Sequence, residues 1–221
     1  NNIIHVGAVT TARSADLAEH AARGGAEAIC CVPPFFYRRN DEEIVEHYRV
    51  VAAAADLPLF AYNLPSATGT EIDPPLMQKI QDGVPQLAGL KHSVANLSNL
   101  RAFARMGLAA FTGSCHWMLP AMTLGAVGSV DGPPSVVPEL WVKIWEAYQA
   151  GELKKAEEAQ DRASETVGAL SHCGGGFHAM IKAAIGLRLG IDCGEPRAPG
   201  LPLEKGQFEA LARIIDELGL R

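Results

Sequence analysis

Short apolar runs rich in β-branched residues alternate along the chain with longer segments whose apolar residues recur at helical spacing. The runs predict six strands, each followed by a segment that predicts a helix. The predicted strands lack polar–apolar alternation, which is typical of parallel strands covered on both faces. They span residues 3–9, 28–32, 58–64, 88–91, 109–113 and 126–130.

The segments between these strands carry the residues with which helices begin and end. Ser14 is the expected N-cap of the first helix, and Gly24 and Gly25 mark its end. Strand–helix units joined by short connections predict parallel strands with right-handed crossovers. The other helices are predicted from Asp41 and over residues 74–80, 99–106, 117–124 and 138–150.

The alternation stops near Gly151, after which the sequence predicts three helices and no strand. They span residues 152–170, 177–189 and 205–218. We therefore expect barrel units over residues 1–150 and a C-terminal three-helix extension, packed on the barrel, over residues 151–221.

Two α/β architectures fit this order of elements. A doubly wound sheet would bring a glycine-rich loop after its first strand, but residues 7–11 contain one glycine. A (β/α)8 TIM barrel needs eight units. We expect such a barrel, with a C-terminal helical extension and with the first two βα units missing from the given sequence.

Composition narrows the classes of function. The 19 Lys and Arg against 25 Asp and Glu give a net charge of −6, and no basic stripe indicates nucleic-acid binding. No apolar run is long enough to predict a membrane span. The five cysteines have no C-x-x-C spacing, which favours the reducing cytoplasm and buried thiols at Cys30 and Cys31. We expect neither a metal nor a cofactor.

Lys91 is the one charged residue in residues 84–93, at the end of a predicted buried strand. Burial favours the neutral amine of a lysine, and a neutral amine attacks carbonyl groups to form a Schiff base. The alternative is a lysine whose ammonium extends into solvent beyond the strand end.

Tyr62 ends the preceding strand on the same side as Lys91. Neighbouring strands lie about 4.8 Å apart, so the phenol and the amine can share a pocket in which the phenol transfers protons. A buried tyrosine of purely structural role is the alternative. The polar residues at the other strand ends are Ser93, Gly113, Cys115, His116 and Ser129. Five other histidines are expected to be structural or solvated: His5, His20, His47, His172 and His178.

Two segments carry a family resemblance. Residues 62–69, Tyr-Asn-Leu-Pro-Ser-Ala-Thr-Gly, resemble the Y-x-x-P-x-x-T-G segment of the dihydrodipicolinate synthase and N-acetylneuraminate lyase superfamily. Residues 89–93, Gly-Leu-Lys-His-Ser, resemble its G-x-K-x-[ST] lysine strand. Residues 3–8, 125–129 and 195–199 are similar to the N-acetylneuraminate lyase branch in particular.

The resemblance implies roles for single residues. Lys91 would form the Schiff base with pyruvate or another 2-oxo acid, and Tyr62 would be the proton relay. Thr68 belongs to the segment beside Tyr62. Ser93, Gly113 and Ser129 would line the part of the pocket that holds the sugar acid.

The resemblance also implies partners and an assembly. Pyruvate would be joined by an aldehyde or a sugar, and the enzyme would be a homotetramer. An aromatic residue reaches across a subunit contact in the family, and Phe36 takes the place that is tyrosine in many relatives.

Two departures from the family pattern concern the substrate. Cys115 and His116 stand where sialic-acid lyases have an Asp-Glu pair, and each hydroxyl partner lost costs about 1–3 kcal/mol. His116 would suit a flatter acceptor, or both residues simply fill the loop. The family's Ser/Thr-rich loop for the 2-oxo acid carboxylate is not in this sequence.

We therefore predict a class I pyruvate-dependent aldolase or lyase, similar to N-acetylneuraminate lyase. A dihydrodipicolinate-synthase-like enzyme, a hydratase-aldolase or a dehydratase that uses the same imine is the first alternative. A non-catalytic homologue that binds 2-oxo acids is the second.

Overall fold

The computed structural model describes residues 2–220 of the chain. They form two compact units, each described here by itself. Unit 1 comprises Asn1–Ser114 and Pro120–Ser129, and unit 2 comprises Cys115–Leu119 and Val130–Arg221. The domain boundary expected after residue 150 stays a prediction.

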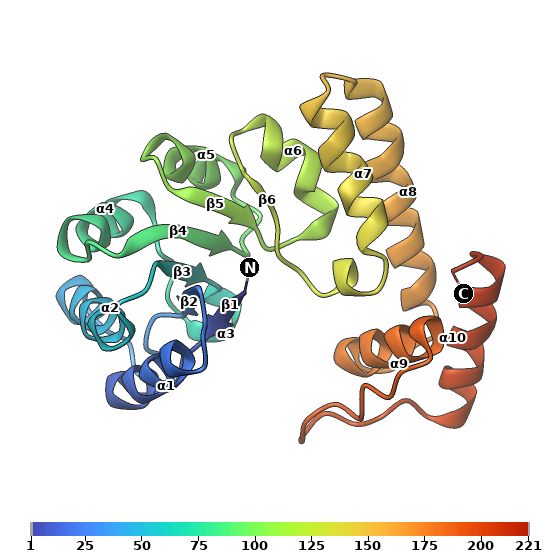
Figure 1. Ribbon diagram of the computed structural model, residues 1–221, viewed down its shortest axis with the longest axis horizontal. Coiled ribbons are helices and arrows are strands. Elements are labelled where there is room, and N and C mark those ends of the chain that lie inside the picture. Colours follow the sequence, from blue (N-terminus) through green and yellow to red (C-terminus); the bar gives the residue numbers. More distant parts are fainter. Residues whose placement is uncertain (1, 221) are drawn as a thin grey trace. The chain divides into compact units, whose positions relative to one another are not determined.

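Unit 1 is built on six parallel strands that pair in sequence order (Figure 1). In a doubly wound sheet the order reverses at a switch point, whereas in a (β/α)8 barrel each strand pairs with the next. The uninterrupted order therefore confirms the predicted barrel type of α/β fold, here as a curled six-stranded sheet. The strands are β1 (Ile3–His5), β2 (Ala28–Cys31), β3 (Leu59–Asn63), β4 (Leu87–His92), β5 (Ala109–Thr112) and β6 (Gly128–Ser129).

The helices confirm the predicted sequence of elements, with one wrong cap. Thr10, not Ser14, caps the first helix, since its side chain accepts a hydrogen bond from the Arg13 N–H. Ser14 lies inside that helix, where its hydroxyl accepts the Ala8 N–H at 2.9 Å. The helices are α1 (Thr11–Arg23), α2 (Asp41–Ala55), α3 (Pro65–Thr68), α4 (Pro74–Gly83), α5 (Leu97–Arg105), α6 (Met118–Thr123), α7 (Pro138–Gln149), α8 (Leu153–Ser171), α9 (Phe177–Leu189) and α10 (Lys205–Glu217).

The core of unit 1 lies between the sheet and its helices. Leu59 of β3 and Leu90 of β4 are fully buried, and Tyr48 of α2 and Phe103 of α5 cover the same side of the sheet without solvent exposure. Burying a large apolar side chain contributes roughly 1.5–3 kcal/mol, so this layer holds the strand ends in place.

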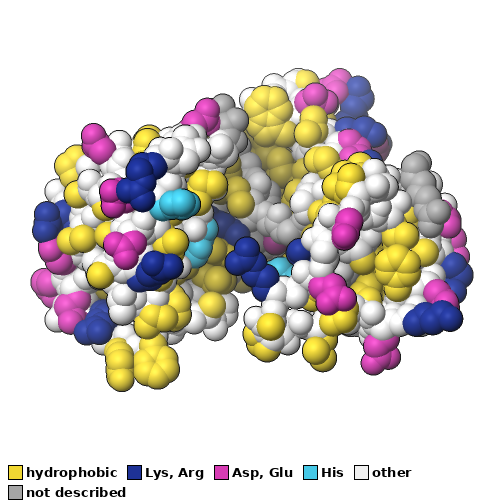
Figure 2. Space-filling view, turned by 60° about the horizontal axis from the view of Figure 1, so that its bottom comes forward, with side chains coloured by type: hydrophobic (Ala, Val, Ile, Leu, Met, Phe, Trp, Pro, Cys, Tyr) yellow, Lys and Arg dark blue, Asp and Glu magenta, His cyan; other side chains and the backbone are white. Residues whose placement is uncertain are grey.

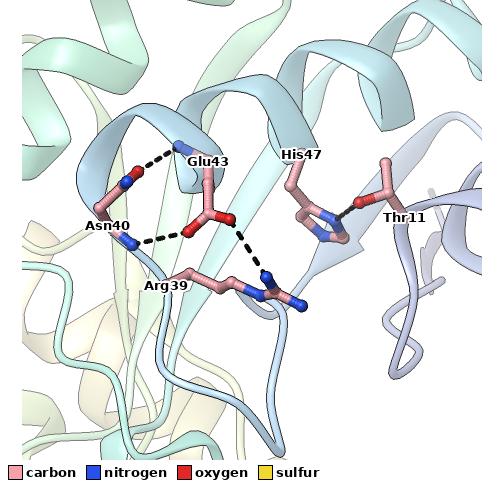
Figure 3. A network of polar contacts seen from close by, with 5 residues as sticks. All are labelled: Thr11, Arg39, Asn40, Glu43 and His47. Carbon is pink, nitrogen blue, oxygen red and sulfur yellow. Dashed lines mark hydrogen bonds and ion pairs between the residues drawn. The ribbon is translucent and has the colours of Figure 1, made fainter.

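A polar cluster joins α1, α2 and β2 (Figure 3). The Thr11 hydroxyl and His47 Nδ1 lie 3.0 Å apart, and His47 Nε2 lies 3.5 Å from the Cys31 sulfur. Asn40 and Glu43 form a capping box at the start of α2, where Arg39 pairs with Glu43 at 3.1 Å. Burial lowers the pKa of His47 to about 4, so the ring is neutral at neutral pH.

The opposite side of the sheet, here called the inner face, carries aromatic side chains. The Phe60 and Phe111 rings lie 6.0 Å apart across Gly89 of β4. A Cβ on Gly89 would come within 2.6 Å of the Phe60 ring and 2.3 Å of the Ala109 carbonyl oxygen. Glycine is therefore required here, two residues before Lys91.

Unit 2 consists of α7–α10 and two 3-10 helices, η1 (Cys115–Trp117) and η2 (Pro133–Ser135). Arg188 of α9 connects three segments of unit 2. Its guanidinium donates to the carbonyl oxygens of Val136 and Leu220 and pairs with Glu139. Charges of both signs mix with apolar side chains on the face shown in Figure 2. Within residues 2–220, no helix has the length and apolar character that a membrane crossing requires.

Candidate active site

Lys91 and Tyr62 are neighbours in the ladder between β3 and β4, which pairs them directly. The Lys91 Nζ lies over the Tyr62 ring, 4.3 Å from its centroid. The predicted pair is thus brought together. The amine contacts the face of the ring, a cation–π geometry, and not the phenol oxygen. Both side chains are partly buried.

His5 is a third member of this group that the sequence did not single out. Its ring meets Tyr62 edge-on, with centroids 5.8 Å apart and an interplanar angle of 89°. Burial, and then the charge of Lys91, lower the pKa of His5 from its usual value. From the sequence we expect His5 to be structural or solvated, because it falls inside the strand predicted over residues 3–9, whereas β1 ends at His5.

Cys30 lies beside His5 in the register between β1 and β2. Burial raises the pKa of its thiol to about 12, although the positive charge of Lys91 acts in the opposite direction. The thiol is therefore neutral at neutral pH and gives the inner face an apolar wall below Tyr62. Its burial confirms the prediction that Cys30 is a core residue.

The polar residues on the helix side of these strands are all satisfied. Asn63 donates to the Ile72 carbonyl oxygen at 2.8 Å and accepts the Ile72 N–H at 3.0 Å. His92 contacts Asn63 at 3.2 Å and the Asn96 carbonyl oxygen at 3.1 Å. The Thr112 hydroxyl is bonded to the Ser114 backbone. These groups hold the strand ends and have no free hydrogen-bonding capacity for a ligand.

The inner face differs in this respect. Within residues 2–220, the Lys91 amine, the Tyr62 hydroxyl and the His5 ring nitrogens form no hydrogen bond or ion pair with other protein groups. Three polar groups that converge without partners, beside buried apolar walls, form the kind of surface that binds a polar ligand.

Ser93 and Gly113 lie together just beyond the ends of β4 and β5. The Ser93 N–H donates to the Asn63 carbonyl oxygen at 2.9 Å, and the Gly113 N–H to that of His92 at 2.8 Å. A Cβ on Gly113 would lie 1.8 Å from the Ser93 hydroxyl oxygen. Gly113 therefore leaves space for the hydroxyl of Ser93, a residue that lies two positions after Lys91.

Thr68 and Ser129 are placed differently. The Thr68 hydroxyl lies 3.0 Å from the Leu64 carbonyl oxygen and 3.1 Å from that of Thr70, inside its own turn. Ser129 is in register with Thr112, not with the strand positions that hold Lys91. Its hydroxyl is buried and has no hydrogen-bond partner among the described residues.

Cys115 and His116 belong to unit 2. The Cys115 N–H donates to Asp131 at 3.0 Å, and its carbonyl oxygen accepts from Trp141 at 3.3 Å and Gln160 at 3.2 Å. Burial, followed by the nearby Asp131 carboxylate, raises the pKa of the Cys115 thiol to about 12. These contacts fix the start of η1. His116 beside it is exposed.

Phe36 follows β2 with its side chain 81% exposed and a backbone φ of +87°. A left-handed conformation is unusual for an aromatic residue. It directs the ring against Tyr37, at a centroid distance of 4.9 Å. The expected subunit contact at Phe36 stays a prediction.

No group of three or more His, Cys, Asp or Glu side chains placed to hold a metal ion occurs among the described residues. The chemistry that the site can perform is that of an amine, a phenol and an imidazole.

Comparison with known proteins assigns the family. Residues 2–218 match the dihydrodipicolinate synthetase family over nearly the whole chain. The chain belongs to this family. An uncharacterized DapA-like lyase of Halobacterium salinarum is 36% identical over 220 residues, which cover 99% of this chain and 71% of the relative. The N-acetylneuraminate lyase of Rattus norvegicus is 34% identical over 228 residues, covering 98% of this chain and 68% of the relative.

Among solved structures, the sialic acid aldolase of Ruminococcus gnavus superimposes with a TM-score of 0.90 at 25% identity, covering 98% of this chain and 74% of that one. The resemblance inferred from residues 62–69 and 89–93 is therefore confirmed at the level of the family. Its similar members are named as lyases, aldolases and synthases, which supports a lyase.

Proposed function

We propose that this protein is a class I pyruvate-dependent aldolase or lyase in which Lys91 forms the imine. The observation that carries the proposal is the position of the Lys91 amine, over the Tyr62 ring and without an ion-pair partner among the described residues. An amine without an ion-pair partner at a strand end can attack a carbonyl carbon once it has lost its proton.

The chemistry follows from these groups. The uncharged amine attacks the C2 carbonyl carbon of a 2-oxo acid, and a proton passes from nitrogen to oxygen to give a carbinolamine. A second proton lets the hydroxyl leave as water, which produces the protonated imine. Tyr62 is the group that donates and accepts these protons.

The protonated imine is an electron sink. In the cleavage direction the C4 hydroxyl gives its proton to a base, the C4–O bond becomes the carbonyl of the released aldehyde, and the imine takes up the electron pair of the bond between C3 and C4. The resulting enamine is protonated at C3, and water hydrolyses the imine to return pyruvate and the free amine. Condensation is the reverse sequence. No metal or cofactor takes part in these steps.

The substrate in the cleavage direction is a 2-oxo acid other than ordinary sialic acid, and the acceptor in the condensation direction is an aldehyde or a sugar. The family resemblance implies that the Asp-Glu pair of sialic-acid lyases binds the hydroxyls of the sugar acid, and in this chain Cys115 and His116 replace that pair. A flatter or less hydroxylated acceptor suits this pair of residues better. We further propose that the active protein is a cytoplasmic homotetramer.

The proposal is tested by reducing the protein with borohydride in the presence of pyruvate and mapping the adduct by peptide mass spectrometry. We expect a reduced pyruvate adduct on Lys91 and none in the Lys91→Met variant. The Lys79→Met variant is the matched control, because Lys79 is an exposed lysine paired with Asp41 at 2.9 Å. An adduct on another lysine, or none on the unmodified chain, excludes the mechanism.

A further inference from the structure

The imidazole of His5 is folded over the backbone of Gly7. A Cβ on Gly7 would lie 2.8 Å from His5 Cε1, 2.9 Å from His5 Nε2 and 2.6 Å from a methyl of Val32. Any residue with a side chain at position 7 would therefore displace the ring. The sequence makes room for the imidazole at the end of β1.

His5 also differs from the buried histidines of unit 1. His47 and His92 use their ring nitrogens in hydrogen bonds that join elements. The His5 ring forms no such bond within the part of the chain that the structure describes. Its close contact is with Tyr62, edge-on at 5.8 Å. A structural role like that of His47 does not account for this position.

We propose that His5 is a positioning residue of the imine site, which holds the Tyr62 ring in place beneath the Lys91 amine. The inference rests on the proposed function. Tyr62 is contacted on its face by the amine and edge-on by the imidazole. Edge-to-face ring pairs contribute about 0.5–1.5 kcal/mol beyond burial, enough to favour one ring orientation. A fixed ring orientation also fixes the position of the phenol oxygen, the group that transfers protons in the proposed imine chemistry.

The contact depends on the charge of His5. The titratable groups that face the ring are Lys91, Tyr62 and Cys30, and of these Lys91 is the cation. The His5 residue keeps an exposed surface, but desolvation by its neighbours and then the Lys91 charge lower the pKa of the ring from its usual value, so the ring is neutral at neutral pH. A protonated ring would be a second cation beside Lys91. Repulsion between the two cations would disfavour the contact of the ring with Tyr62.

Two substitutions separate shape from charge. His5→Phe keeps a flat ring against Tyr62 but cannot be protonated, and His5→Ala removes both properties. His20→Ala is the control, since His20 is exposed on α1. The measurement is the rate at which the borohydride-trapped pyruvate adduct forms on Lys91, from about pH 5 to about pH 8, the interval around the ordinary imidazole pKa.

We expect His5→Ala to form the adduct roughly tenfold more slowly than the unmodified chain at about pH 8, as for a displaced catalytic group, and this difference should shrink towards about pH 5. His5→Phe should be affected less, and the ratio of the unmodified rate to the His5→Phe rate should fall as the pH falls. A His5→Ala rate equal to that of the unmodified chain at about pH 8 overturns the positioning role. A ratio that is constant with pH overturns the dependence on the neutral ring.

A second readout does not need the reaction. The pKa of His5, followed by NMR, should rise in Lys91→Met, because the neighbouring charge is removed. No change would mean that His5 and Lys91 are not coupled, and would contradict the inference. If the unmodified chain forms no adduct at all, the proposed function fails. Adduct formation that is insensitive to His5→Ala removes the inference alone.

Discussion

Gly113 is the residue at which the candidate site has the least space. A Cβ there would lie 1.8 Å from the Ser93 hydroxyl oxygen, 2.7 Å from Ser93 Cβ and 2.9 Å from Ser93 Cα. Because backbone atoms are involved, a change of rotamer cannot relieve the overlap. We expect Gly113→Ala to lower the free energy of unfolding by about 1–3 kcal/mol, measured by urea denaturation.

Two variants check the cause of this loss. Ser93→Gly combined with Gly113→Ala removes the two side-chain clashes and should recover part of the lost stability. Gly168→Ala, at an exposed position of α8 with open space around its Cα, should be neutral or stabilising by up to about 1 kcal/mol. A fully stable Gly113→Ala protein would contradict the packing at the ends of β4 and β5.

Single residues were predicted unevenly from the sequence. Lys91 and Tyr62 could be predicted from the sequence, because each lies near the end of a predicted strand. The two strands are consecutive in the chain and pair with one another, which makes the two residues neighbours. His5 was missed because its significance comes from contacts with Tyr62 and with Gly7, which no sequence spacing reveals. Ser14 was misassigned as a cap because Thr10, one turn earlier, has the same capping chemistry.

His47 connects three elements, α1, α2 and β2, and makes their packing dependent on pH. Burial lowers its pKa from 6.5 to about 4. Between these values the unfolded chain binds a proton that the folded protein does not. The free energy of unfolding should therefore fall by roughly 2–4 kcal/mol as the pH drops from 6.5 to about 4. Below about pH 4, His47 should contribute little further change.

The measurement is urea unfolding at several pH values across that interval. His47→Gln should flatten the dependence, although part of it remains because burial also lowers the pKa of His92. The same variant should be less stable at neutral pH, since the Thr11 hydroxyl loses its partner at 3.0 Å. His20→Gln should keep the full dependence. An unchanged pH slope in His47→Gln would show that another group titrates there.

At the scale of elements, the hydrophobic pattern predicted the six strands and the long helices but not their ends. The sixth run, predicted over residues 126–130, is paired only at Gly128–Ser129. The pattern shows which residues avoid water, whereas a strand end depends on hydrogen bonds to the neighbouring strand. The one-turn helix α3 (Pro65–Thr68) was not predicted because it has no repeated apolar spacing.

At the scale of the whole chain, the sequence signal for a division was the loss of strand–helix alternation near residue 150. The compact units of the structure separate around residues 114–130, and α7 packs with α8 within unit 2. That packing depends on buried side chains such as Trp141 and Ile144, which the alternation of elements does not encode. Each unit therefore has buried apolar residues of its own, with one continuous cluster confined to unit 1.

Separate cores predict separate unfolding transitions. All three tryptophans, Trp117, Trp141 and Trp145, lie in unit 2, so their fluorescence reports the unfolding of that unit alone. Far-UV circular dichroism follows the helices of both units, and the NMR signal of the buried His47 ring follows unit 1. Each unit has buried side chains of its own, so we expect the fluorescence transition in urea to coincide with only part of the dichroism change. The His47 signal should follow the remainder. Superimposable curves from all three probes would show that the chain unfolds as a single cooperative unit.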